Sequence, residues 1–144
     1  MREFNWQKAY PDLRLLDETD SFLLGHTYED ALLIRKRNGE HVIEDDFYGD
    51  PTCGYISRQD DWAVVAGEHV TTWHSKRGKQ IVRFENHQWV QALRYIENAC
   101  IQLLVDSFGK HGAIWELDVQ RNSLRRIREF QDYREQPFTE DIIW

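Results

Sequence analysis

The sequence is poor in cysteine: it has two, Cys53 and Cys100, which lie far apart and form no Cys-x-x-Cys motif. Two cysteines cannot provide the disulfide framework of a small secreted domain, and no spacing of cysteine and histidine typical of a metal site is present. We therefore expect free thiols in a reducing cytoplasm, and we expect neither a metal nor a cofactor.

Long apolar runs are also missing. No stretch approaches the length that a membrane-spanning helix requires, and residues 1–8 lack the apolar core of a signal peptide. The sequence therefore predicts a cytoplasmic protein that makes no contact with a membrane.

Basic charge is in deficit, because 25 Asp and Glu residues stand against 18 Lys and Arg residues, for a formal net charge of −7. An acidic surface repels phosphate backbones, so no binding to nucleic acid is expected. A basic protein partner is favoured instead. The same charge is also within the range that simply keeps a small domain soluble.

No motif of known catalytic mechanics is present: Gly-x-Ser-x-Gly, His-Glu-x-x-His, the P-loop and Gly-x-Gly-x-x-Gly are all absent. His69 and His74 lie five residues apart on a predicted hairpin, and this odd spacing directs them to opposite faces of a strand. They are therefore poor ligands for one shared metal ion. The sequence predicts that the protein is not an enzyme.

Aromatic residues are abundant, at 13% of a chain of 144 residues. A chain of this length can bury a substantial core, and we expect a single domain over 1–144. Within it, short apolar runs separated by polar turns recur at a spacing of about forty residues. The predicted repeats are 13–52, 53–91 and 92–130, between an N-terminal arm, 1–12, and a C-terminal strand, 131–144.

Residues at matching positions support the repetition. Asn38-Gly39 is a strong hairpin signal, and its glycine has a counterpart in the second repeat. The aligned pairs are Gly39 with Gly78, Trp73 with Trp115, and Tyr55 with Tyr95. A meander of strands could also repeat this period by chance.

This pattern of four strands per unit over 13–130 resembles the repeat of a β-propeller. The Gly-His and Trp-Asp dipeptides of the WD40 family are absent from their places, and three units are fewer than the four to eight blades of a typical propeller. The resemblance implies an all-β fold, an antiparallel meander of about three four-stranded propeller-like repeats. We expect it to be open unless the chain ends or a second chain supply the missing blade.

One segment is compatible with two structures. In 88–98, the residues Val90, Leu93 and Ile96 recur at helical spacing, so this segment fits one short helix as well as a strand.

Acidic residues crowd the predicted turns. In the alignment, Asp20 and the pair Asp60-Asp61 occupy the same turn of their repeats, so their charges are expected to converge. An acidic rim flanked by aromatic residues would steer and anchor a basic protein. Acidic residues in turns also cap and solvate the chain for local reasons. The candidate partner-binding residues are Glu44, Asp45, Asp46, Asp60, Asp61 and Trp62.

In length, acidity and aromatic-rich β pattern, the chain resembles the small acidic immunity proteins that bacteria carry against polymorphic or contact-delivered toxins. The pattern of 114–118, followed by 124–130, 132–133 and 142–144, is similar to such proteins. The resemblance implies a tight complex with a basic toxin domain, and it assigns no binding residue. Two alternatives are a structural subunit that self-associates through sheet edges and 142–144, for example as a homodimer, and an enzyme built on unrecognised His and Asp residues.

Overall fold

The structure, a computed structural model, describes residues 5–84 and 88–144. Its strands form three antiparallel four-stranded sheets, each with its strands in sequence order. Sheet A contains β1 (Arg14–Glu18), β2 (Phe22–Thr27), β3 (Asp30–Arg35) and β4 (His41–Asp46). Sheet B contains β5 (Cys53–Ile56), β6 (Trp62–Ala66), β7 (Val70–His74) and β8 (Gly78–Val82). Sheet C contains β9 (Val90–Glu97), β10 (Cys100–Val105), β11 (Ala113–Asp118) and β12 (Ser123–Glu129), and a short helix, α1 (Trp6–Ala9), precedes sheet A.

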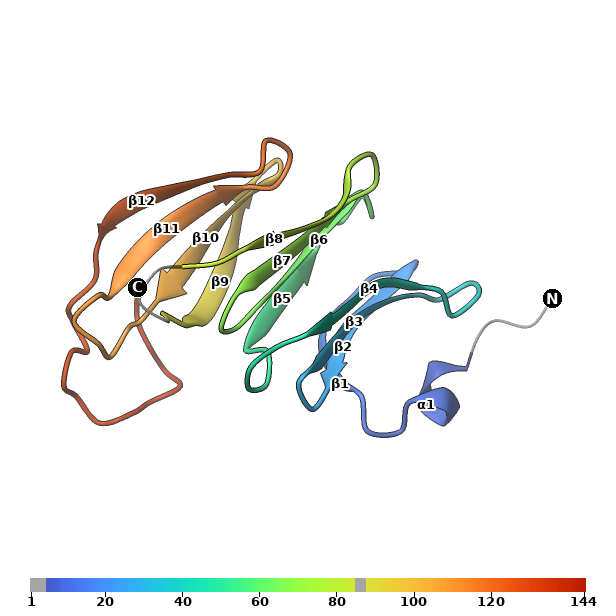
Figure 1. The fold of residues 1–144 in the computed structure, drawn as a ribbon, viewed down its shortest axis with the longest axis horizontal. Coiled ribbons are helices and arrows are strands. Elements are labelled where there is room, and N and C mark those ends of the chain that lie inside the picture. The colour runs from blue at the N-terminus through green and yellow to red at the C-terminus, as the bar shows by residue number, and fades with distance from the viewer. Residues whose placement is uncertain (1–4, 85–87) are drawn as a thin grey trace.

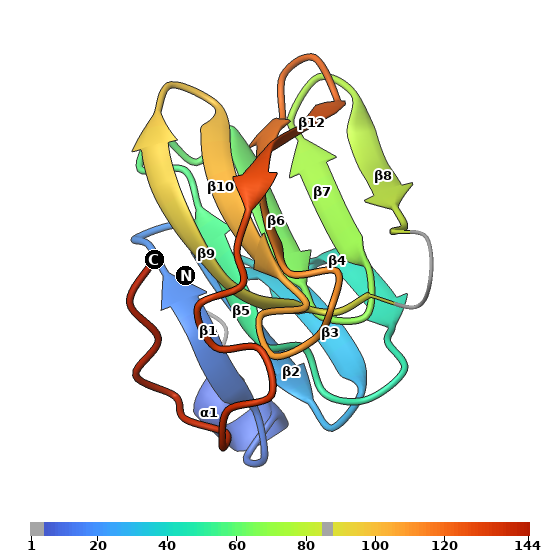
Figure 2. The same ribbon diagram turned by 90° about the vertical axis from the view of Figure 1, so that its left-hand side faces the viewer.

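The predicted all-β fold of three four-stranded repeats is therefore confirmed. The sheets stand side by side with sheet B in the middle. Figure 1 shows the stack from the side, and Figure 2 shows it from the end formed by sheet C. Their first strands lie next to one another, β1 beside β5 and β5 beside β9. This is the arrangement of neighbouring propeller blades, and the described elements form an open stack rather than a ring.

Sheet B is covered on both faces, and the sequence of β6, one of its two inner strands, reflects this. All of β6 is buried. Ala63 and Val65 pack into the apolar cluster shared with sheet A, whereas Trp62, Val64 and Ala66 pack into the cluster shared with sheet C. A strand buried on both faces needs apolar side chains at every position, because successive residues point to opposite faces.

Aligned residues occupy corresponding places in the stack, which supports the repetition. Trp73 packs against Phe22 of sheet A, and Trp115 packs against Phe84, which follows sheet B, each with ring centroids 5.4 Å apart. Each tryptophan thus projects from a third strand onto the sheet before it. Gly39, in the β3–β4 turn, and its counterpart Gly78, the first residue of β8, both have a positive φ, of 75° and 77°. The hairpin at Asn38-Gly39 is longer than a two-residue turn, since β3 ends at Arg35 and β4 begins at His41.

The outer faces of the stack are covered by the segments that flank it. On sheet A, the buried residues Leu23, Leu32 and Ile34 pack against the N-terminal segment. The covering side chains there are Trp6, Tyr10 and Leu13. On sheet C, the buried cluster is Leu104, Ile114 and Phe130, covered by Tyr133, Ile142 and Trp144. A further sheet could stack on either end only by displacing these residues.

The predicted C-terminal strand over 131–144 is wrong, because this segment contains turns and no strand. Turn hydrogen bonds join Arg134 N–H to the Gln131 carbonyl and Gln136 N–H to the Tyr133 carbonyl, and Glu135 has a positive φ of 62°. Pro137 then follows, and proline has no N–H to donate to a strand partner. The segment covers the face of sheet C instead of extending its edge.

The helical alternative for 88–98 is also wrong, because Val90–Glu97 form strand β9. The register of β9 against β10 shifts between Val90 and Ala92, where Gln91 is the extra residue. This bulge places Val90 and Leu93 on the same face, toward sheet B, while Ala92 faces outward. A spacing of three residues on one face imitates a helix, and a β-bulge produces it here.

None of the helices in the described residues has the length and apolar character of a membrane span.

Candidate functional site

The six predicted site residues fall into two groups. Asp60, Asp61 and Trp62 lie where the β5–β6 turn enters β6. This turn lies beside the β1–β2 turn, since the Thr19 hydroxyl donates a hydrogen bond to Asp60. Asp60 has a positive φ of 59°, which aspartate tolerates better than most residues. The predicted proximity of these two turns is thus present, although Asp60 meets a hydroxyl there rather than a second carboxylate.

Glu44, Asp45 and Asp46 lie in strand β4 rather than in a predicted connection. Asp46 pairs with Asp30 beside the β2–β3 turn, which is at the opposite end of the sheet from the β1–β2 turn. A hydrogen bond with Asp46, then burial, then the charges of Asp46, Glu44 and Glu29 raise the pKa of Asp30. The structure therefore does not bring the six residues together into one acidic rim.

Asp45 belongs to a polar link between sheets A and B. Alternation along β4 turns it toward sheet B, where its carboxylate accepts hydrogen bonds from Thr71 and from His69 Nε2, the latter at 2.8 Å. The other ring nitrogen of His69 is hydrogen-bonded to Glu68, and the ring stacks on Phe47 with centroids 3.8 Å apart. The His69 side chain has 0% exposure. It is therefore placed to join the sheets rather than to meet a substrate.

The link has an electrostatic consequence. Burial alone would raise the pKa of Asp45 and Glu68, but it is outweighed in both. Hydrogen bonds from Thr71 and His69 and the charge of His69 lower the pKa of Asp45. Hydrogen bonds from His69 and the Tyr48 backbone, with the charge of His69, lower the pKa of Glu68. Both carboxylates are thus stabilised in their ionised form by folding.

This arrangement predicts a specific loss of stability in acid. The folded-state pKa of each carboxylate is below its unfolded value of about 4, so the unfolded chain takes up protons first as the pH falls. The stabilisation is complete at neutral pH and is lost as the pH falls through the lowered folded-state pKa. Urea unfolding at pH 6, 4 and 3 should therefore show a smaller acid-induced loss for Asp45→Asn than for the wild type. Equal losses would contradict the assignment.

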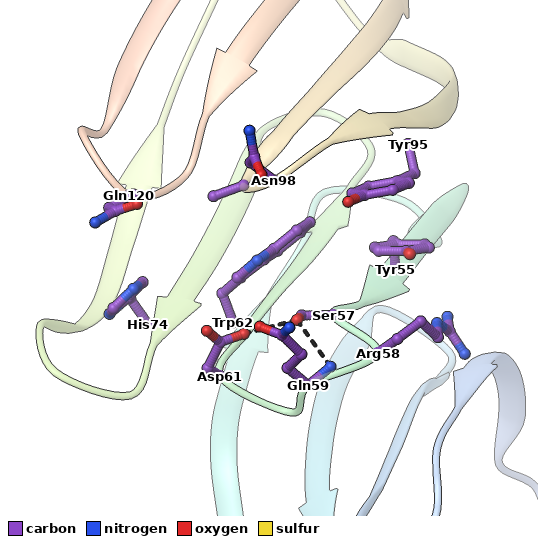
Figure 3. A pocket seen from close by; sticks show the side chains of 11 residues that line it. Tyr55, Ser57, Arg58, Gln59, Asp61, Trp62, His74, Tyr95, Asn98 and Gln120 are labelled. Atoms are coloured by element: carbon purple, nitrogen blue, oxygen red, sulfur yellow. Dashed lines mark hydrogen bonds between the residues drawn. The ribbon is translucent and has the colours of Figure 1, made fainter.

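A hollow of about 330 Å³ opens between sheets B and C, and Figure 3 shows it. The β5–β6 turn, the end of β7, the β9–β10 turn and the β11–β12 turn contribute its walls. We call it the B–C hollow. Of the predicted site residues, Asp61 and Trp62 line it. Loops carried on a rigid scaffold of this kind are where binding residues concentrate.

Aromatic rings form one side of the B–C hollow. Tyr55 and Tyr95 stack with centroids 5.1 Å apart and planes inclined by 9°, and Trp62 lies 5.5 Å from Tyr55. Trp62 is 3% exposed and belongs to the core, whereas Tyr95 is 44% exposed. Arg58 lies 4.8 Å over the Tyr55 ring and donates a hydrogen bond to Asp17 of sheet A. This side of the hollow thus consists of the buried Trp62 ring at its base and the accessible Tyr95 ring at its margin.

Polar groups from turns of both sheet B and sheet C complete the lining. The buried Ser57 hydroxyl donates a hydrogen bond of 2.6 Å to Asp61, and it accepts one from the Gln59 backbone. His74 Nδ1 accepts a hydrogen bond from the Lys76 backbone. The bonds of the Ser57 hydroxyl hold the Asp61 carboxylate in place. Three side-chain amides on the wall, those of Gln59, Asn98 and Gln120, have no hydrogen bond to another described residue.

Part of this site can be predicted from the sequence. Tyr55 and Tyr95 align as first-strand residues, and first strands lie next to one another in stacked repeats, so the alignment is sufficient to predict that the two rings stack. Asn98 and Gln120 gave no signal, because turn residues of this kind occur throughout the chain. Cys53 and Cys100 are free thiols, and burial raises the pKa of Cys53 to about 12 and that of Cys100 to about 11.

Comparison with known proteins adds no assignment: no protein-family model matches the chain, and a search of curated proteins found no match.

Proposed function

We propose that the chain is a protein-binding module and that its partner docks on the B–C hollow and the turns around it. One observation carries the proposal. The hollow combines an accessible aromatic residue, Tyr95, with a fixed carboxylate, Asp61, on turns held by three packed sheets. Aromatic anchors set in a rigid surface are typical of the energetic centres of protein interfaces.

Charge supports a basic partner. The formal net charge of −7 gives a long-range attraction for a basic protein, which raises the rate of association at low salt. More narrowly, we propose that the chain is a cytoplasmic immunity protein that binds and neutralises a bacterial toxin. The support for this is the resemblance in length, acidity and β pattern. A toxin gene immediately upstream would strengthen it.

Self-association is the alternative, and one observation favours it. Phe138 and Ile143 are 75% and 82% exposed on the C-terminal segment. Ile142 and Trp144 belong to the same proposed contact, but they pack onto the chain's own sheet C and are therefore not available to a second copy. Arginines also line β12, an edge strand of that sheet, and charged edge strands oppose pairing with a second sheet. We therefore rank self-association second.

The experiment uses the protein encoded immediately upstream, expressed as a toxin domain in a laboratory bacterium with and without this chain. We expect the chain to restore growth and to bind the toxin domain in isothermal titration calorimetry. Asp61→Asn should weaken binding about tenfold, since it removes a charge but keeps the shape that meets Ser57. Asp132→Asn makes the same change in net charge at an exposed position of the C-terminal segment, and it should change affinity less than twofold. Equal effects of the two variants would contradict the proposed location.

A further inference from the structure

The B–C hollow contains acceptors without a matching cation. The Asp61 carboxylate accepts a hydrogen bond from the neutral Ser57 hydroxyl, and no described lysine or arginine forms an ion pair with it. The amide oxygens of Asn98 and Gln120, which come from turns of sheet C across the hollow from Asp61, are also open to a donor. Figure 3 shows these groups and the Trp62 ring around one space. A ligand that fills this space is best matched when it is flat, cationic and rich in donors.

The protein already binds this type of group on the neighbouring face of the same ring stack. Arg58 places its guanidinium over Tyr55 and donates to the carboxylate of Asp17. A second example is Arg94, whose guanidinium lies 4.1 Å over the Trp144 ring. A guanidinium is planar, keeps its charge and presents five N–H donors, so it suits an aromatic face beside a carboxylate better than an ammonium group does.

We infer that the B–C hollow receives an arginine side chain of the partner protein. Its guanidinium lies against the aromatic side and donates hydrogen bonds to Asp61. The amides of Asn98 and Gln120 accept the remaining donors. This inference rests on the proposed function and names the group that the site recognises. The volume of about 330 Å³ is at the lower end of the range for ligand pockets and suits one long side chain.

The charges around the hollow are compatible with a bound cation. Arg58 lines the hollow, but its charge is balanced by Asp17. His74 lines the hollow, and its Nδ1 is occupied as the acceptor of a hydrogen bond from the Lys76 backbone. Glu97, at the end of β9 beside the β9–β10 turn, is exposed and adds negative charge nearby.

The test uses two tripeptides as probes, acetyl-Gly-Arg-Gly-amide and the same peptide with citrulline, which keeps the shape of arginine without its charge. Each is titrated into the full-length protein labelled with nitrogen-15. We expect the arginine peptide to cause saturable shifts of the Trp62 indole N–H and of the Asn98 and Gln120 side-chain amides. The citrulline peptide should bind at least tenfold more weakly. Asp61→Asn should weaken arginine binding about tenfold, and Asp132→Asn should not change it.

Each outcome decides the inference. Equal binding of both peptides, or no shifts at these amides, overturns it. Failure of the inference is distinguishable from failure of the proposed function. If the peptides do not bind but Asp61→Asn still weakens the toxin complex, the site binds a protein through another group. If the arginine peptide binds but Asp61→Asn leaves the toxin complex unchanged, the hollow accepts arginine and the proposed docking face is wrong.

Discussion

Replacing Asp45 with alanine should lower the free energy of unfolding by about 3 kcal/mol. The Asp45 side chain is 12% exposed and accepts hydrogen bonds from Thr71 and from a histidine ring with 0% exposure. Its removal leaves the Nε2 atom of His69 with the Thr71 hydroxyl, 3.1 Å away, as its remaining partner in the core. A buried polar group that loses its partner costs more than the bond itself contributes, because water cannot replace it.

The matched control is Asp46→Ala, on the same strand but exposed on the opposite face. It should change the free energy of unfolding by less than about 0.5 kcal/mol, or stabilise the protein slightly, since it relieves repulsion with Asp30. Urea unfolding of both variants at pH 7 measures the difference. If Asp45→Ala and Asp46→Ala have equal effects, the polar link does not join sheets A and B as described.

Deleting residues 137–144 should destabilise the protein by about 2–3 kcal/mol and cause it to associate. The deletion removes Ile142 and Trp144 from the outer face of sheet C, where Leu104, Ile114 and Phe130 are at most 1% exposed. It also removes the ring under the Arg94 guanidinium. An uncovered apolar sheet face of this kind promotes aggregation. Urea unfolding and light scattering after size-exclusion chromatography measure the two effects.

Ile143→Ala is the control for the deletion, because this side chain is 82% exposed. It should leave stability within about 0.5 kcal/mol of the wild type. The deletion also separates the proposed function from self-association. If residues 142–144 were the contact of a homodimer, the intact protein would be oligomeric at micromolar concentration and the deletion would dissolve the oligomer. We expect the reverse, a monomer that associates once its cover is lost.

The strands could be predicted from the sequence because their burial in the stack requires a regular arrangement of apolar residues. The unbroken apolar run of β6 follows from burial on both faces, and the match of Trp73 with Trp115 follows from equivalent positions in the stack. The prediction was wrong where the local backbone geometry departed from that of a regular strand. The bulge at Gln91 puts Val90 and Leu93 on one face of β9, and this spacing of three residues is also typical of a helix. In 131–144, apolar residues at the end of the segment favour a strand, but the segment contains Pro137, which cannot donate a backbone hydrogen bond, and no strand forms.

The site was less predictable because it depends on which ends of the strands meet in space. Asp45 and Asp61 both looked like turn carboxylates, but β4 continues through Asp45, and strand alternation then turned that residue into the core. Trp62 was predicted beside the acidic turn and does lie there, as a buried base rather than an exposed anchor. Tyr95 is the accessible ring, and its place follows from the stacking of first strands.

Hydrogen–deuterium exchange of the chain, free and bound to its protein partner, tests the docking location most directly. We predict that binding slows exchange in the β5–β6 turn, 57–61, and in the β9–β10 and β11–β12 turns, while the backbone of β4 around Asp46 is unchanged. Protection confined to β4 and the β2–β3 turn, or to residues 138–143 of the C-terminal segment, would contradict the assignment of the B–C hollow as the binding face.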